Sequence, residues 1–150
     1  MSIKRMLLLV GLSVLFAGCS TSRFYGSNST AYSDSSAKSM GVRYLLGRGV
    51  EQSNEKAFYY FNQAAKDGDP FAQNEIAYMY AAGKGTARDY SKAFDWYKKA
   101  AAQGLASAQY NVGLFYLHGL GTPADKSQAR MWFQKSAAHG FEPARVALSR

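Results

Sequence analysis

Apolar residues recur at helical spacing through most of the chain. In the middle of the sequence one stripe has the spacing i, i+3, i+4, i+7 and i+8, and it consists of Ala93, Trp96, Tyr97, Ala100 and Ala101. This spacing is one face of an amphipathic α-helix. A shorter stripe precedes it, made of Ala72, Ile76 and Tyr80 with the small residue Ala77 beside them. The pattern therefore predicts a pair of helices.

The same pattern occurs three times at an interval of 36 residues, in the segments 36–71, 72–107 and 108–143. Residues of like chemistry stand at matching places in the three segments: Tyr44, Tyr80 and Tyr116; Ala57, Ala93 and Ala129; Tyr60, Trp96 and Trp132. A fixed period of about 20–50 residues is typical of solenoids, in which one unit cannot bury its apolar face alone. We therefore expect most of the aromatic residues to lie in the core.

The ends of the predicted helices also repeat. Ser53, Asp89 and Asp125 precede the second helix of each unit, where a side-chain oxygen can accept a hydrogen bond from the first turn. Glycines follow its last turn, at Gly68, Gly104 and Gly140. A Gly-x-Gly sequence joins the two helices of each unit, at 47–49, 83–85 and 119–121. Two glycines in a short loop predict positive φ angles. The spacing of a phosphate-binding loop is absent.

These patterns predict an all-α fold, a right-handed α-solenoid of antiparallel helix pairs with three repeats and a C-terminal capping helix. The predicted repeat domain covers 36–150. Its cap at 144–150 begins a fourth unit, since Ala144 and Leu148 match the core positions of a first helix.

The N-terminal segment 1–18 has the three parts of a secretory signal. Lys4 and Arg5 form its basic part, 6–16 is apolar, and small residues precede Cys19. The sequence around Cys19 resembles the lipobox of bacterial lipoproteins, although Phe16 stands where that family usually has leucine. The resemblance implies a lipidated Cys19, and Ser20 after it implies the outer membrane. The alternative is an ordinary cleaved signal followed by a free cysteine.

Residues 19–35 are rich in serine and predict a flexible tether from Cys19 to the repeats. The net charge of the chain is +8, and Lys4 and Arg5 of the leader account for two of these charges, which leaves +6. Since the remaining cations are scattered, nucleic acid is not an expected partner.

The repeats resemble the Sel-one-like repeat (SLR) family, relatives of the tetratricopeptide repeats. The family pattern is A-x-x-x-L-G-x-x-Y-x-x-G-x-G, then D-x-x-x-A-x-x-W-[YF]-x-x-A-A-x-x-G. The second and third units match it closely, and the first lacks the Asp and the Trp. The resemblance implies an adaptor that holds a protein or peptide on its concave face.

The residues expected on that face belong to the first helices and point away from the packed stripe. They are Lys38, Val42, Asn74, Tyr78, Tyr110, Leu114 and His118. Exposed apolar and aromatic groups on such a surface are typical of partner contacts. The alternative is that some of them pack against neighbouring helices.

The sequence shows no catalytic constellation. His118 and His139 stand at different places in the repeat without ligands at metal spacing, so we expect both on the surface and no metal or cofactor. The acidic residues are expected mainly on helix surfaces and at caps. The predicted function is a non-enzymatic adaptor on the outer membrane that binds an envelope protein or peptide and faces the periplasm. Two alternatives remain open: an immunity or inhibitor lipoprotein acting on a periplasmic toxin, and a cell-wall or β-lactam-binding protein.

Overall fold

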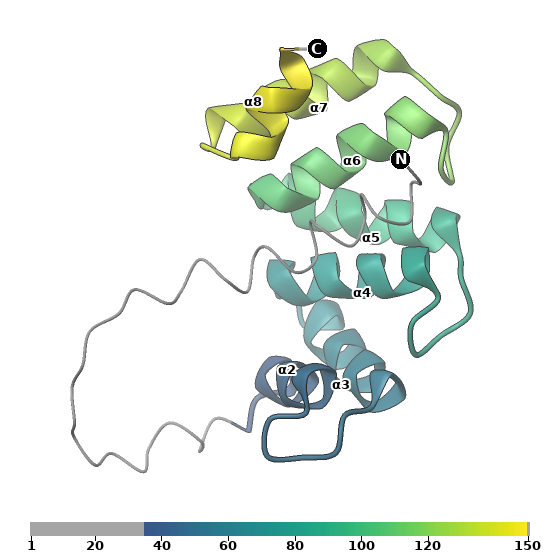
Figure 1. The fold of residues 1–150 in the computed structure, drawn as a ribbon, viewed down its shortest axis with the longest axis vertical. Coiled ribbons are helices and arrows are strands. Elements are labelled where there is room, and N and C mark those ends of the chain that lie inside the picture. The colour runs from purple at the N-terminus through teal and green to yellow at the C-terminus, as the bar shows by residue number, and fades with distance from the viewer. Residues whose placement is uncertain (1–34, 150) are drawn as a thin grey trace, which may run out of the picture.

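The computed structural model describes residues 35–149, which form seven α-helices and contain no strand (Figure 1). The helices are α2 (Ala37–Leu46), α3 (Asn54–Lys66), α4 (Pro70–Ala82), α5 (Tyr90–Ala102), α6 (Ala106–His118), α7 (Lys126–Ala138) and α8 (Glu142–Leu148). The predicted leader at 1–18, Cys19 and the tether up to residue 34 lie outside the described residues. Within 35–149, no helix combines the length and the apolar character that crossing a membrane requires.

Each helix packs mainly against the helix before it and the helix after it in the chain. Figure 1 shows this order directly, with the helices stacked from α2 to α8 along the long axis of the molecule. The prediction of an all-α solenoid is therefore confirmed. One apolar core runs through α3, α4, α5 and part of α6, and a smaller cluster joins α6 to α7 and α8.

The predicted helix caps are present in all three units. Ser53 Oγ accepts a hydrogen bond from Lys56 N at 3.2 Å, and Asp89 Oδ1 accepts one from Lys92 N at 3.0 Å. Asp125 Oδ1 accepts two, from the backbone amides of residues 127 and 128 at 2.9 and 3.0 Å. These bonds satisfy amides that the helix itself leaves unpaired.

The loops between paired helices use both glycines of the Gly-x-Gly sequence in the left-handed region, as predicted. Gly83 ends α4 with φ +67° and Gly85 follows with φ +69°. The second glycine has a further role, since Gly85 lies against the backbone carbonyl of Asn54 at the start of α3. Gly121 lies in the same way against the carbonyl of Tyr90 at the start of α5. Each loop is thereby packed on the unit before it.

Small residues on the first helices allow close packing of the helix pair. A side-chain carbon added to Gly41 would lie 2.7 Å from the ring of Phe61. Gly113 stands in the same relation to Phe133, and Ala77, at the matching place in α4, is fully buried. The prediction that a small residue lets the two helices approach is therefore confirmed.

The aromatic residues of the second helices divide between the core and its edge. Tyr97 is 1% exposed, whereas its neighbour Trp96 is only half-buried. The ammonium of Lys99 lies 3.9 Å from the centre of the Trp96 ring, and Lys135 lies 4.4 Å from that of Trp132. The two tryptophans thus form the outer margin of the stripe, each covered by a lysine.

The C-terminal helix α8 covers part of the last unit. Ala144 is fully buried against α7, as the repeat register predicts, and Leu148 is half-buried. At seven residues, α8 is much shorter than the 13-residue α6. It therefore covers only part of the end of the solenoid.

Candidate functional site

The candidate site lies on the first helices of the three units, α2, α4 and α6, and their shared surface is called the inner face below. The structure places four of the seven predicted contact residues in the interior. Their exposed fractions are 1% for Asn74, 5% for Tyr78, 7% for Tyr110 and 3% for Leu114. The expectation that these four side chains are exposed is therefore wrong. Their part in binding stays a prediction.

Contacts with the next unit explain the burial on α6. The centre of the Tyr110 ring lies 5.3 Å from the centre of the Phe133 ring on α7. It lies 5.5 Å from the ring centre of Phe141, which precedes α8. Leu114 belongs to the same apolar cluster. These residues join α6 to the end of the solenoid, so their truncation would remove core packing.

On α4, Tyr78 is buried as part of the main apolar core, and Asn74 is buried at the contact with α6. Asn111 Nδ2 on α6 donates to Asn74 Oδ1 at 3.2 Å, and this bond links two neighbouring first helices directly. Tyr78 lies one turn after Asn74 on α4, and the ammonium of Lys84 is 5.3 Å from the centre of its ring. This part of the inner face is polar, although the sequence interpretation emphasised its aromatic residues.

The other three predicted residues lie at the surface or its margin. Lys38 is exposed and pairs with Asp69 at 2.8 Å, which connects α2 to the residue that caps α4. Val42 is half-buried beside it in an open hollow of about 460 Å³ that is also lined by Ser39 and Phe71. His118 is exposed at the end of α6. The seven residues therefore do not form one continuous exposed patch.

A group of buried polar residues lies between α4 and α6, and we call it the inner polar cluster. It consists of Asn74, Glu75, Tyr78, Ser107 and Asn111. Asn74 Nδ2 donates to Glu75 Oε1 at 3.3 Å. Three buried atoms of the cluster have no hydrogen-bond partner among the described residues: Tyr78 Oη, Ser107 Oγ and Asn111 Oδ1. Buried polar atoms are nearly always hydrogen-bonded in folded proteins. Three unpaired atoms in one cluster are therefore unusual and make the cluster a candidate for binding.

Sequence reasoning missed Glu75, because acidic residues were expected at surfaces and caps. The side chain is 2% exposed. Burial raises the pKa of its carboxyl group to about 7, and the hydrogen bond from Asn74 only partly opposes this shift. Burial, with smaller contributions from Glu75 and Tyr78, also raises the pKa of the neighbouring Tyr97. A signal was present in the sequence, since Glu75 directly precedes Ile76 of the predicted apolar stripe and stands where the third unit has Asn111.

A second polar network repeats between units and holds them in register. Gln73 Nε2 donates to the Ala65 carbonyl at 3.1 Å, and Gln109 Nε2 donates to the Ala101 carbonyl at 3.2 Å. The oxygens of these two amides are 2.8 Å from Gln103 Nε2 and 3.0 Å from His139 Nδ1, respectively. The exposed His139 thus occupies the place of Gln103 in the repeat. No group of three or more potential metal ligands occurs among residues 35–149.

Comparison with known families identifies the repeats. The Sel1 repeat matches residues 35–69, 70–105 and 106–141. A comparison with curated proteins gave no match.

Solved structures with the same fold include close and distant relatives. A Sel1 repeat protein from Oxalobacter formigenes is 39% identical in sequence to this chain, and the two structures superpose with a TM-score of 0.70. The matched region covers 75% of this chain and 85% of the Oxalobacter chain. A protective antigen of uropathogenic Escherichia coli strains with an SLR fold is 36% identical over 69% of this chain and 22% of its own, with a TM-score of 0.69. Helicobacter pylori cysteine rich protein B is 20% identical over 98% of both chains, with a TM-score of 0.64, and shows the likeness of the fold alone.

Proposed function

The chain belongs to the Sel1 repeat family, and from this membership we propose that it is an adaptor that binds an envelope protein or peptide along its inner face. Sel1 repeats suggest a scaffold for protein–protein interaction, and members of the family are generally non-catalytic. To that general role the proposal adds the inner face as the binding surface, an envelope protein or peptide as the partner, and the outer membrane as the location.

The inner polar cluster is the observation that carries the proposal. A peptide backbone presents N–H donors and C=O acceptors in alternation, and the amide and hydroxyl groups of this cluster can match both. Tyr78 Oη, Ser107 Oγ and Asn111 Oδ1 are buried and unpaired among residues 35–149, so a partner that displaces the side chains covering them gains hydrogen bonds that the described residues do not make. The cluster joins two first helices, which supports binding across units rather than within one.

The proposed location is the outer membrane, with the repeats in the periplasm. Support comes from the sequence before Cys19, which resembles a lipobox, and from the serine-rich stretch that follows it. A tether of this composition spans about 20–25 Å at roughly 5–6 Å times the square root of its length. Anchored in this way, the repeats would remain close to the membrane surface.

Replacing Cys19 by serine is expected to release the protein from the membrane fraction. The thioether to the lipid cannot form on a serine, and each buried methylene of an acyl chain contributes about 0.8 kcal/mol to anchoring. Palmitate labelling and membrane fractionation measure the effect, with a Ser20→Ala protein as the control. Equal labelling of the Cys19→Ser protein and the unaltered protein would show that Cys19 is not the lipidated residue.

Replacing Tyr78 by phenylalanine is expected to weaken partner binding about fivefold to tenfold, the loss of one hydrogen bond of roughly 1 kcal/mol. The substitution keeps the buried ring and removes only the unpaired hydroxyl, so the free energy of unfolding should be unchanged or slightly increased. The measurement is cross-linked capture from envelope extract with the lipidated, C-terminally tagged protein, followed by titration of the captured partner.

Tyr116→Phe provides the matched control, because the Tyr116 ring packs on Phe94 of α5, with ring centres 5.2 Å apart, and lies outside the inner polar cluster. Binding that weakens equally in both variants would contradict a role for the inner face. Unaltered binding by the Tyr78→Phe protein would do the same.

A further inference from the structure

The open hollow of about 460 Å³ on the inner face lies between α2 and α4, the first helices of the first two units. It is lined by Lys38, Ser39 and Val42 of α2 and by Phe71 of α4. Val42 and Phe71 are half-buried and form an apolar wall. The ammonium of Lys38 is paired with Asp69 at 2.8 Å. The hollow therefore offers an apolar surface to a partner, and the charge of the lysine at its edge is already neutralised.

The buried carboxyl group of Glu75 belongs to the same joint between α2 and α4. Phe71 and Glu75 stand four residues apart on α4, so both lie on the side of that helix next to α2. The repeat supports this placement, because Glu75 corresponds to Asn111, whose side chain reaches back to Asn74 on the preceding first helix. On α2 the place of Asn74 is taken by Lys38. The hollow and the carboxyl group are therefore neighbours on the inner face.

No cation within residues 35–149 forms an ion pair with Glu75. Around the inner polar cluster the titratable groups of α2, α4, α5 and the following loop are Lys38 with its partner Asp69, Tyr78, Tyr97 and Lys84, which lies over the Tyr78 ring. The buried residues of α3 and α6 carry no charge. Burial without an opposite charge is the reason that the pKa of the Glu75 carboxyl group is raised to about 7.

The unpaired atoms of the inner polar cluster are all oxygens: Tyr78 Oη, Ser107 Oγ and Asn111 Oδ1. An amide oxygen and an ionised carboxylate can only accept hydrogen bonds, and a hydroxyl oxygen can accept as well. A lysine ammonium has three donors, an arginine guanidinium has five, and neither has an acceptor. A cationic group therefore matches these oxygens and the carboxylate of Glu75 more fully than a single peptide N–H does.

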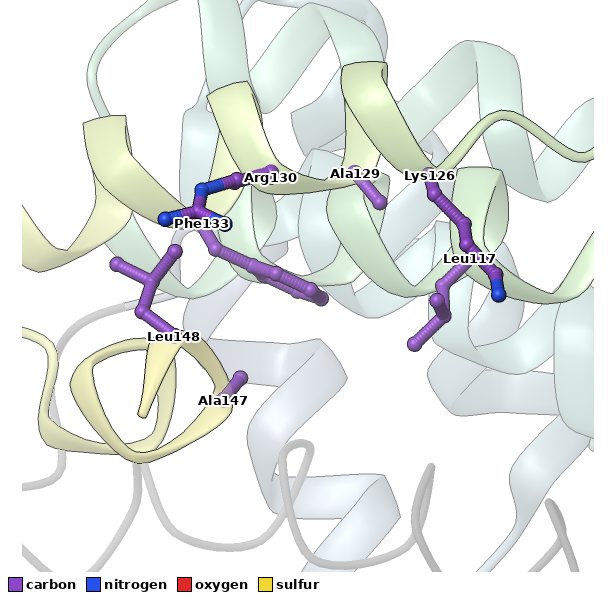
Figure 2. A pocket seen from close by; sticks show the side chains of 7 residues that line it. All are labelled: Leu117, Lys126, Ala129, Arg130, Phe133, Ala147 and Leu148. Atoms are coloured by element: carbon purple, nitrogen blue, oxygen red, sulfur yellow. The ribbon is translucent and has the colours of Figure 1, made fainter. Parts of the chain in front are cut away.

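A second hollow differs from this one in charge. It has a volume of about 370 Å³ and lies between α6, α7 and α8 (Figure 2). Two exposed cations, Lys126 and Arg130, stand among its apolar lining residues, and no acidic residue lines it. A basic side chain is repelled there, so this second hollow provides an internal control for binding at the first.

We propose that the hollow between α2 and α4 and the carboxyl group of Glu75 together bind a lysine or arginine side chain of the partner protein. The stem of that side chain lies against Val42 and Phe71, as long basic side chains commonly lie on apolar surfaces. Its cationic group reaches Glu75 and the unpaired oxygens, and the side chains that cover Glu75 move aside as it enters. This inference rests on the proposed function, since it names the group by which a partner is held on the inner face.

Binding of this kind is coupled to the release of a proton. The cationic group favours the ionised carboxylate, so it lowers the pKa of Glu75 from its value of about 7 in the free protein. Only a minority of the free molecules carry an ionised Glu75 at pH 6, whereas most do at pH 8. The affinity for a basic side chain is therefore expected to fall about tenfold from pH 8 to pH 6.

The test uses the full chain and two peptides of equal length with blocked ends and the same glycine and serine flanks. The central residue is lysine in one peptide and norleucine in the other, which keeps the apolar stem and lacks the ammonium. NMR of the side-chain amides of Asn74 and Asn111 measures binding. At pH 8 the lysine peptide is expected to bind roughly tenfold or more tightly than the norleucine peptide, the value of a hydrogen-bonded ion pair. The carboxyl-carbon signal of Glu75, assigned by its loss in Glu75→Gln, should show the lowered pKa.

Glu75→Gln should remove the preference for lysine, whereas the control Glu142→Gln, at a side chain that is 68% exposed, should keep it. Equal affinity for the two peptides overturns the proposal, and so does a lysine preference that Glu75→Gln leaves unchanged. Signals of Ala129 and Ala147 in the second hollow should not shift with the lysine peptide. Lys38→Gln should leave the pKa of Glu75 in the free protein unchanged. A higher pKa in that variant would overturn the proposal, by showing that Lys38 itself supplies the cation.

Failure of this inference can be told from failure of the proposed function. Capture of a partner from envelope extract that Tyr78→Phe weakens and Glu75→Gln leaves unchanged would retain the inner face as the binding surface. The same result would overturn the assignment of a basic side chain to Glu75. Circular dichroism at pH 8 shows that the variants keep their helices, which is expected for Glu75→Gln because it removes a buried charge.

Discussion

Replacing Gly121 by alanine is expected to destabilise the protein by roughly 3 kcal/mol or more, placing the change among the severe single substitutions. Gly121 has φ +64°, a conformation that costs a side chain about 1–2 kcal/mol. Its added carbon would also lie 2.7 Å from Ser91 N and closer still to the Tyr90 carbonyl, so either the loop or the start of α5 must shift. Chemical denaturation monitored by circular dichroism measures the loss.

Gly140→Ala separates the two causes of that loss. Gly140 also has positive φ, +78°, but a side-chain carbon added there would meet no atom within 4 Å. Its replacement should therefore cost only the conformational term, about 1 kcal/mol. Equal losses at Gly121 and Gly140 would mean that the contact between the loop and the preceding unit does not contribute to stability.

Stability is expected to fall as the pH rises from about 5 to 8, because of Glu75. Its pKa is raised from 4.5 to about 7 in the folded protein, so the folded state binds its proton more tightly than the unfolded state does. The contribution is fully present below about pH 4.5 and is lost as the pH rises through about 7. With about 1.4 kcal/mol for each pH unit of difference, the loss is about 3 kcal/mol.

Glu75→Gln is expected to remove most of this pH dependence and to raise the stability at pH 8. The glutamine keeps an oxygen that can accept from Asn74 and carries no charge to bury. Glu142→Gln is the control, because the Glu142 side chain is 68% exposed. Urea unfolding at several pH values compares the proteins. A Glu75→Gln protein with the same pH profile as the unaltered protein would contradict the assignment.

Much of the fold could be predicted because its determinants are local and repeated. The caps at Ser53, Asp89 and Asp125 and the positive φ of the paired glycines depend on a few neighbouring residues, and three copies supported each assignment. The packing of small residues against rings followed from the helical periodicity. What the periodicity did not show is that the second glycine of the loops in the second and third units rests on the preceding unit. This contact joins residues about 31 positions apart, such as Gly85 and Asn54.

The candidate site was harder to predict because burial on the inner face depends on contacts between units. The helical spacing put Tyr110 outside the predicted apolar stripe of its helix, but it could not show that Phe133 of α7 and Phe141 of the next segment would cover the ring. Asn74 is likewise buried by a bond to α6 that no pattern within α4 reveals. Glu75 was assigned to the surface by its charge, whereas the packing of neighbouring helices places it inside.

The joints between units have an evolutionary consequence. Gly85 and Gly121 rest on the backbone carbonyls of Asn54 and Tyr90, two residues with unlike side chains, so the joint does not depend on which residue stands there. Helix contacts are made mainly between neighbours in the chain. Duplication or loss of one 36-residue unit in the gene would therefore leave every remaining joint with a surface of the same shape. The length of the inner face can in this way change by whole units without a new core.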